Sequence, residues 1–338
     1  MKRYCDGSTK HHGAALLTAM LTVVLVASLA SAMLWQQWRG VEIEAAQRTR
    51  VQSAWILTGA LDWARLILRE DARQGGADHL AEPWAIALAP ARLSTFLAAQ
   101  QGQTVVADSS EGVEEAFLSG HIEDLQARLN VSNLLVNGKP DEASVQTWKR
   151  LFEQLDLPPS ELQQMTRRLE LAFDTDAKTK AQAPLQPQTV SDLMWLGLSS
   201  RTLEVLRPFV TLLPVRTSVN LNTAAPEVLV ACIPGFDMAQ ARSLVTSRAS
   251  QHLTTLQDAE KRLANPVIQL DAVSHAIASR FFSVTGQLRV GSYTMQEQSV
   301  LQRDGMDVKT LRRTRETVSQ LAPKTTTQMD TSNTLPNQ

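Results

Sequence analysis

The histidines are the first residues to test for catalysis or metal binding, and their spacing argues against both. Four of them lie far apart in the sequence: His79, His121, His252 and His275. None belongs to an H-E-x-x-H pair, and the sequence contains neither a G-x-x-x-x-G-K-[ST] loop nor a G-x-S-x-G turn. His11 and His12 are adjacent but lie in the short segment before the first apolar run. The sequence therefore predicts a protein that is not an enzyme.

The two cysteines, Cys5 and Cys232, offer little redox or nucleophilic chemistry. Cys232 lies in an apolar run, residues 228–233, where a thiol is expected to be buried and unreactive. If the N-terminal segment is removed, Cys232 remains alone and no internal disulfide can form. The formal net charge of -1 at pH 7 also gives no indication of nucleic-acid binding.

A charged leader followed by a long apolar run marks the N-terminus. Residues 14–34 carry no charge, and their number reaches the ~20 residues that a helix needs to cross a hydrocarbon core of ~30 Å. Lys2, Arg3 and Lys10 precede the run, so this end is expected to stay in the cytoplasm. The sequence predicts one membrane-spanning helix with the soluble part on the opposite side of the membrane.

Three fates of the leader are compatible with these residues. The leader ends in Gly13 directly before the apolar helix, and this junction resembles the class III signal of type IV pilins and type II secretion pseudopilins. In that family a prepilin peptidase cuts after the glycine and methylates the new amine, here that of Ala14. Residues 30–32 have the A-x-A form of an ordinary signal-peptidase site, which would give a chain beginning at Met33. An uncleaved membrane anchor is the third possibility.

Thr18 would be the fifth residue of a chain beginning at Ala14. Most pilin-like proteins have glutamate there, and its carboxylate can pair with the N-terminal amine of a neighbouring subunit inside the apolar filament. Threonine cannot form that ion pair. A subunit of this kind suits the filament tip, where no neighbour lies above it, although a small polar residue is also ordinary in a membrane helix.

The helical pattern continues beyond the membrane to about Arg69, and no proline occurs before Pro83. Apolar or small residues recur at nearly helical spacing, at Val51, Ala54, Trp55, Thr58, Leu61 and Leu68. Four of them are predicted to contact the helices of partner subunits: Val51, Trp55, Thr58 and Leu61. The alternative is that this stripe packs only on the protein's own sheet. Gly75 and Gly76 are expected to end the helix.

Strands are predicted on both sides of a helical block. Apolar and polar residues alternate between Leu125 and Val131, which predicts a half-buried strand. Further strands are expected at 280–289, 293–302 and 306–311. The intervening sequence is helical and charged, so the class is α+β with a helical insertion.

The segment 219–237 resembles a helix-hairpin-helix unit, in which a glycine turn presents backbone amides to a DNA phosphate. Asp237 stands where the second glycine of the usual turn would be, so its carboxylate would repel a phosphate. No basic cluster adjoins the unit. A structural use of this scaffold is therefore favoured over DNA binding.

Several motifs together resemble, in their order, the minor pseudopilin K family of type II secretion. They are the leader with Thr18, residues 79–84, 120–130 and 133–134, 206–210, and the 220–224 unit. The resemblance implies a pilin-like α+β fold, in which a long membrane-spanning helix packs on an antiparallel sheet, with a large all-α insertion. It also implies a minor pseudopilin at the tip of the periplasmic pseudopilus, assembling with minor pseudopilins I and J at the inner-membrane secretion platform. The main alternative is a membrane-tethered or periplasmic DNA-binding protein of the competence type.

The same resemblance raises the question of calcium, because family members can bind it in the inserted domain through an acidic segment. This chain offers Asp174 and Asp176, followed by few further oxygen donors. Calcium takes six to eight oxygen ligands, so two aspartates alone make a poor site. Calcium is therefore the one cofactor to consider, and a solvated loop is the alternative.

The expected organisation along the chain follows from these signals. It comprises a cleaved leader (1–13), a transmembrane helix (14–34), the first part of the pilin-like domain (35–140), the helical inserted domain (141–275), C-terminal strands (276–316) and a disordered tail (317–338).

Overall fold

The structure is a computed structural model that describes residues 12–95, 116–174, 183–263 and 268–317. The chain divides into two compact units, residues 1–56 and 57–338, and each is described by itself. The predicted tail beyond Thr317 and most of the predicted leader lie outside the described residues.

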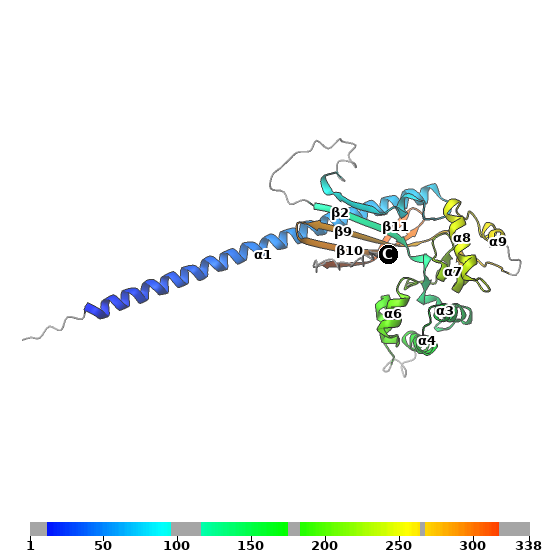
Figure 1. Cartoon of the computed structure of the whole chain (residues 1–338), viewed down its shortest axis with the longest axis horizontal. Coiled ribbons are helices and arrows are strands. Elements are labelled where there is room, and N and C mark those ends of the chain that lie inside the picture. The colour runs from blue at the N-terminus through cyan, green and yellow to red at the C-terminus, as the bar shows by residue number, and fades with distance from the viewer. Residues whose placement is uncertain (1–11, 96–115, 175–182, 264–267, 318–338) are drawn as a thin grey trace, which may run out of the picture. The chain divides into compact units, whose positions relative to one another are not determined.

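Helix α1 (His12–Gln74) is a single helix of 63 residues (Figure 1). Its apolar N-terminal half is long and apolar enough to cross a membrane, with a mean hydropathy of 2.2 over its best window. The helix ends a few residues beyond the predicted Arg69, at the expected glycine pair. Gly75 and Gly76 adopt φ angles of +68° and +119°, which disfavour other residues.

A five-stranded antiparallel sheet with the order β1-β2-β9-β10-β11 forms the body of the second unit (Figure 1). Its strands are β1 (Leu88–Arg92), β2 (Ala116–Asp124), β9 (Phe281–Val290), β10 (Tyr293–Asp304) and β11 (Asp307–Thr317). The last three strands confirm the strands predicted from alternation and turn residues near the C-terminus. Consecutive hairpins join them, with Gly291 and Gly305 at positive φ in the turns.

The second part of α1 packs on this sheet through residues spaced by three and four, so that they share one face of the helix. Leu61, Ala64 and Leu68 are buried against Phe282 and Leu301. The short helix η1 (Pro83–Ala85) adds Trp84, whose ring meets the edge of Phe282 at a centroid distance of 5.3 Å. The pilin-like arrangement predicted from the sequence is therefore present.

Two glycines face each other across β2 and β9, and they tolerate a side chain differently. Gly120 and Gly286 are direct partners in the ladder. A Cβ at Gly120 would lie 2.7 Å from the backbone oxygen of Thr285, which the sheet holds in place. A Cβ at Gly286 would lie 3.2 Å from the end of the Leu57 side chain, which can move.

We expect Gly120→Ala to lower the free energy of unfolding by about 2–3 kcal/mol, as overpacking against fixed atoms does. Gly286→Ala is the matched control and should change the free energy of unfolding by less than about 1 kcal/mol. Alanine lowers the conformational entropy of the unfolded chain, and this gain offsets the mild crowding against Leu57. Urea denaturation of both variants measures the difference. Equal stability of the two variants would contradict the strand register described above.

The predicted strand between Leu125 and Val131 was wrong. Two 3-10 turns, η2 (Leu125–Ala127) and η3 (Val131–Leu134), flank a two-residue strand, β3 (Leu129–Asn130). The side chain of Asp124 accepts a hydrogen bond from the Gln126 amide, and that of Asn130 accepts one from the Ser132 amide. These local bonds replace the bonds of a continuous ladder, which is the usual effect of Asp and Asn on the backbone.

The insertion is mainly helical and has its own apolar core. Its helices are α3 (Glu142–Gln154), α4 (Pro159–Phe173), η4 (Val190–Leu196), α6 (Ser200–Leu206), α7 (Pro226–Cys232), α8 (Met238–Ser250) and α9 (Leu256–Leu263). Pairs of two-residue strands supplement them: β4 (Leu135–Val136) with β5 (Lys139–Pro140), β3 with β6 (Val210–Thr211), and β7 (Val219–Asn220) with β8 (His275–Ala276). The expectation of an all-α insertion therefore omitted these short strand pairs.

Strand β11 lies at one edge of the sheet, and no described strand pairs with its outer side. Every residue from Lys309 to Thr317 is exposed. Val300 pairs with Arg312 while Leu301 pairs with Thr310, which leaves Leu311 unmatched in a bulge.

Candidate functional site

The predicted processing residues lie at the start of α1. Gly13 and Ala14 belong to its first turn. Thr18 is helical, and its hydroxyl donates a hydrogen bond of 2.9 Å to the carbonyl oxygen of Ala15. The threonine therefore satisfies its polar group within its own helix, as an apolar environment requires. Cleavage after Gly13 and methylation of Ala14 stay predictions.

The predicted partner stripe divides into an exposed part and a packed part. Val51 and Trp55 are 57% and 73% exposed. Thr58 is half-buried and accepts a hydrogen bond of 2.7 Å from Arg313 on β11. Leu61 is buried in the core between α1 and the sheet. Of the four residues, Val51 and Trp55 expose apolar surface to solvent. Leu61 instead packs on the protein's own sheet, as the alternative interpretation of the stripe predicted.

The two residues suggested for calcium are not brought into a described site. Asp174 follows the last residue of α4, and its amide donates to the carbonyl oxygen of Leu171. Asp176 lies outside the described residues. Calcium binding at these aspartates stays a prediction.

Asp237 occupies the position where a helix-hairpin-helix unit would receive a phosphate. Its carboxylate accepts a hydrogen bond of 2.8 Å from the amide of Gln240 at the start of α8, and the Asp237 amide donates one of 3.0 Å to the side-chain oxygen of Gln240. This capping box uses the donors that a phosphate would need and leaves a negative charge there. The geometry supports the structural use of the scaffold.

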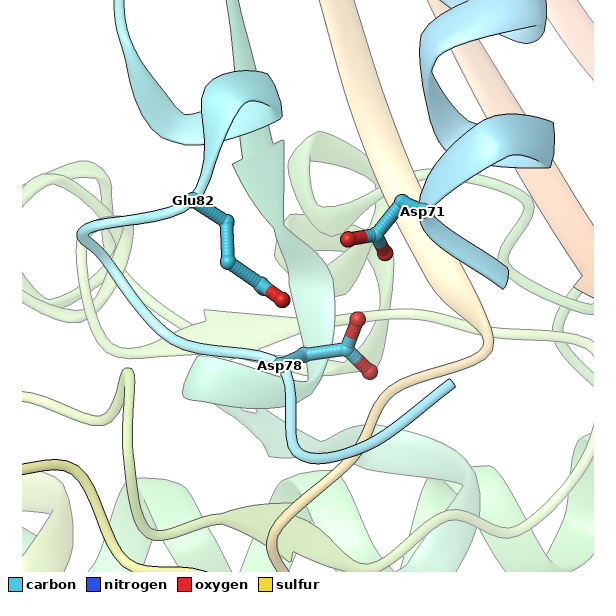
Figure 2. A group of neighbouring side chains, drawn as sticks. All are labelled: Asp71, Asp78 and Glu82. Atoms are coloured by element: carbon cyan, nitrogen blue, oxygen red, sulfur yellow. The ribbon is translucent and has the colours of Figure 1, made fainter. Parts of the chain in front are cut away.

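The most unusual group of side chains is a cluster of three acids, Asp71, Asp78 and Glu82 (Figure 2). Asp71 comes from the last turn of α1, Asp78 from the following loop, and Glu82 from the residue before η1. Oxygen atoms of the three carboxyl groups lie within 4.8 Å of one another. Arg303 of β10 donates to Asp71 at 2.5 Å and to Asp78 at 2.6 and 2.7 Å. Because the guanidinium already binds two of the acids, the cluster is not arranged to hold a metal ion.

A second carboxylate, Asp124 at the end of β2, anchors the insertion next to this cluster. It is buried and accepts four hydrogen bonds, of 2.6–3.0 Å, from Gln126, Asn220, Thr223 and Ser279. Burial raises the pKa of Asp124, and these four hydrogen bonds oppose the shift. The carboxylate therefore ties the sheet to the 220–223 segment of the insertion.

The two networks share members, so they form one polar junction. The Asn220 side chain donates to the backbone oxygen of Asp78 as well as to Asp124. The amide of Ser279 donates to the Asp78 carboxylate at 2.5 Å, and its hydroxyl donates to Asp124. We call this set the junction: Asp71, Asp78, Glu82, Asp124, Asn220, Ser279 and Arg303. Its members connect α1, the sheet and the insertion within the second unit.

Two histidines stack beside the junction. The rings of His79 and His252 lie 3.9 Å apart and nearly parallel, at 11°. His79 follows Asp78 in the loop after α1, and His252 follows α8 in the insertion. Burial lowers the pKa of His79, and the neighbouring His252 lowers it further, while Asp71 opposes both. The stack is therefore favoured when His79 is neutral.

Comparison with known proteins gives this arrangement a family. Two models of type II secretion system protein K match the chain, one at residues 127–215 and the other at residues 219–278. The chain belongs to the type II secretion system protein K family. This result confirms the resemblance inferred from the motifs.

Curated relatives of protein K agree over most of the chain. The type II secretion system protein K of Pseudomonas aeruginosa is 28% identical over 316 residues, covering 86% of this chain and 89% of that protein. The protein K of Pectobacterium carotovorum is 23% identical over 337 residues, covering 90% and 96%. Among solved structures, a chain in the crystal structure of the GspK-GspI-GspJ complex from enterotoxigenic Escherichia coli matches with a TM-score of 0.61. That match has 19% identity and covers 80% of this chain and 98% of that chain.

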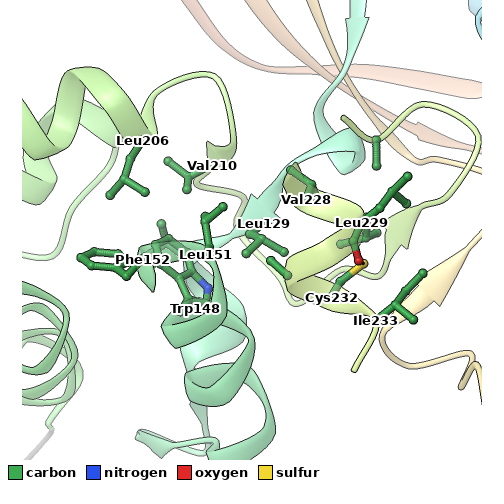
Figure 3. Close-up of a cluster of buried hydrophobic side chains, with 14 of the residues drawn as sticks. Leu129, Trp148, Leu151, Phe152, Leu206, Val210, Val228, Leu229, Cys232 and Ile233 are labelled. Atoms are coloured by element: carbon green, nitrogen blue, oxygen red, sulfur yellow. The ribbon is translucent and has the colours of Figure 1, made fainter. Parts of the chain in front are cut away.

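In this protein K chain, Cys232 is a core residue and not a reactive one (Figure 3). It lies on α7 among Val228, Leu229 and Ile233, in the same core as Trp148 of α3. Burial raises the pKa of the Cys232 thiol to about 12, so the thiolate is scarcely populated at neutral pH. The expectation of a buried, inert thiol is confirmed.

Sequence reasoning found two motifs of the protein K junction but not the junction itself. The 79–84 and 220–224 segments stood out as motifs, yet their partners Ser279 and Arg303 lie in unremarkable sequence. Arg303 is separated from Asp78 by 225 positions. The one available signal for Arg303 was its spacing from Leu301, because residues two apart share a face of a strand and this places Arg303 on the inward face of β10.

Proposed function

We propose that this protein is a minor pseudopilin that assembles with minor pseudopilins I and J at the tip of the pseudopilus of a type II secretion system. The observation that carries the proposal is the pilin-like fold, which matches a chain of the GspK-GspI-GspJ complex. The protein acts by assembly and not by catalysis.

The proposed location is the inner membrane, with α1 crossing it once and the second unit in the periplasm. The apolar N-terminal half of α1 supports the crossing, and the basic residues before it support a cytoplasmic N-terminus. Prepilin peptidase would cleave the Gly13–Ala14 bond at the cytoplasmic side of the membrane. The processed helix would then associate with the inner-membrane secretion platform.

Thr18 supports a tip position. The Thr18 hydroxyl donates its hydrogen bond to the Ala15 carbonyl oxygen within the helix, so this side chain needs no bond from a subunit above it. A carboxylate at this position would need such a partner in an apolar filament. The subunit can therefore end a filament without leaving a buried charge unpaired.

The proposed contact with I and J uses the exposed residues Val51 and Trp55. We expect Trp55→Ala to weaken the ternary complex about tenfold or more, because a large aromatic side chain at an interface often supplies over 1 kcal/mol. Its stability should be unchanged, since the side chain is 73% exposed in the single chain. Co-purification of full-length proteins in detergent, with crosslinking from position 55, measures the effect.

Leu61→Ala is the matched control for that experiment. Leu61 is buried in the protein's own core, so its truncation should lower the free energy of unfolding by about 2–5 kcal/mol. A protein K that forms no complex with I and J, or that is found along the whole filament shaft, would contradict the proposed function. A Trp55→Ala variant that loses stability but keeps its partners would contradict the proposed interface.

A further inference from the structure

The junction contains four acids, Asp71, Asp78, Glu82 and Asp124, and a single arginine, Arg303. Asp71 and Asp78 share the guanidinium of Arg303, and Glu82 receives no bond from it among the contacts described. The guanidinium of Arg280, which lines the same hollow, is paired with Asp304. His79 is disfavoured as a cation because its ring is partly buried and stacked on His252. Three negative charges within 4.8 Å of one another around one positive charge would repel strongly.

Glu82 is the acid best placed to remove this excess by binding a proton. One of its oxygens, Oε2, accepts hydrogen bonds from the His79 amide at 2.9 Å and from the Trp84 indole at 2.7 Å. The other oxygen, Oε1, is left to carry a proton. The acids and Arg303 line a hollow of about 230 Å³, so water can deliver and remove that proton.

Loss of the Glu82 proton would weaken the contacts between the loop after α1 and the insertion. Glu82 holds the loop after α1 through the His79 amide, and His79 stacks on His252 of the insertion. The same loop carries Asp78, whose backbone oxygen accepts from Asn220 of the insertion. A new charge at Glu82 therefore repels the carboxylate of Asp78, which lies in the same loop.

We propose that the junction is a proton-operated latch, in which protonated Glu82 holds the loop of residues 75–82 against the insertion and ionised Glu82 releases it. This device is independent of which partners the protein binds, so it can be tested on the full-length chain alone.

The direction of the pH effect follows from the electrostatics of Glu82. Burial raises its pKa from 4.5 to about 7, the charges of Asp71 and Asp78 add to the rise, and its two hydrogen bonds oppose it. Burial also raises the pKa of Asp78, to about 6, against the influence of Arg303, so Asp78 is mostly ionised at neutral pH. A raised pKa in the folded state means that Glu82 stabilises the fold fully below its unfolded pKa. That contribution is lost as the pH rises through about 7.

Hydrogen exchange of the full-length protein in detergent tests the latch. For the amides of residues 77–82 and of Trp84, corrected for intrinsic exchange, we expect protection to fall about tenfold between pH 5.5 and pH 8.5. Tenfold corresponds to one pKa unit, which is less than the full rise of the Glu82 pKa because Glu82 is partly exposed to solvent. Glu82→Gln keeps an acceptor for the His79 and Trp84 donors but cannot ionise, so it should keep its protection at pH 8.5.

Two further variants keep the proposal falsifiable. Glu70→Gln removes an exposed carboxylate from the last turns of α1 and should behave like the wild type. Asp71→Asn leaves Glu82 in place but removes one repelling charge, so the pH at which protection is lost should move lower. Identical pH profiles for wild type and Glu82→Gln, or an unchanged midpoint in Asp71→Asn, would overturn the latch.

Discussion

Replacing Gly13 by leucine should leave the leader on the chain, so that the protein keeps Met1 and accumulates uncleaved in the inner membrane. The peptidase of the pilin-like class cuts after glycine, and a branched side chain at that position would prevent close approach to the backbone. Intact-mass spectrometry of the purified protein distinguishes the outcomes. The wild type should begin at N-methylated Ala14.

Gly7→Leu is the matched control, because Gly7 lies in the same leader away from the junction. It should be processed normally. A wild-type chain that begins at Met33 would identify an ordinary secretory signal, and one that begins at Met1 would identify a plain anchor. Normal trimming of Gly13→Leu would also refute processing of the pilin type.

Arg303→Leu should lower the free energy of unfolding by about 3–5 kcal/mol, the usual result of leaving buried partners of an ion pair without their cation. The arginine side chain is 10% exposed, and those of Asp71 and Asp78 are 13% and 4% exposed. Its removal also takes a hydrogen bond from the Ser279 carbonyl oxygen. Urea denaturation in detergent at pH 7 measures the loss.

Arg280→Leu is the control for that substitution. Arg280 lines the same hollow, but its side chain is 57% exposed and pairs with the partly exposed Asp304. Exposed ion pairs contribute about 0–1 kcal/mol, so this variant should stay close to the wild type. Equal losses in the two variants would show that Arg303 does not balance the acids of the junction.

Local patterns were sufficient to predict the frame of the molecule. The run of residues 14–34 and the absence of proline before Pro83 predicted α1, and the glycine pair predicted its end. Turn residues predicted β9 and β10 nearly to their ends and the start of β11, which continues beyond the predicted Leu311 to Thr317. These features depend on neighbours in the sequence, where the periods of helices and strands are visible.

The candidate sites were less predictable because they depend on distant residues. Leu61 and Trp55 belong to the same helical pattern, yet only the fold shows that one is buried and the other exposed. The junction requires Asp78, in the loop after α1, to contact Ser279 and Arg303, which lie more than 200 positions later in the chain. No local pattern indicates such a meeting.

The edge strand β11 bears on how copies of this protein can associate. An open strand edge invites the strand of another molecule, and such pairing leads to aggregates. Here the bulge at Leu311 breaks the row of backbone groups, and Lys309 and Arg312 place charges along the strand. Two β11 edges brought together would also repel each other. Lateral growth of the sheet from this edge is therefore disfavoured.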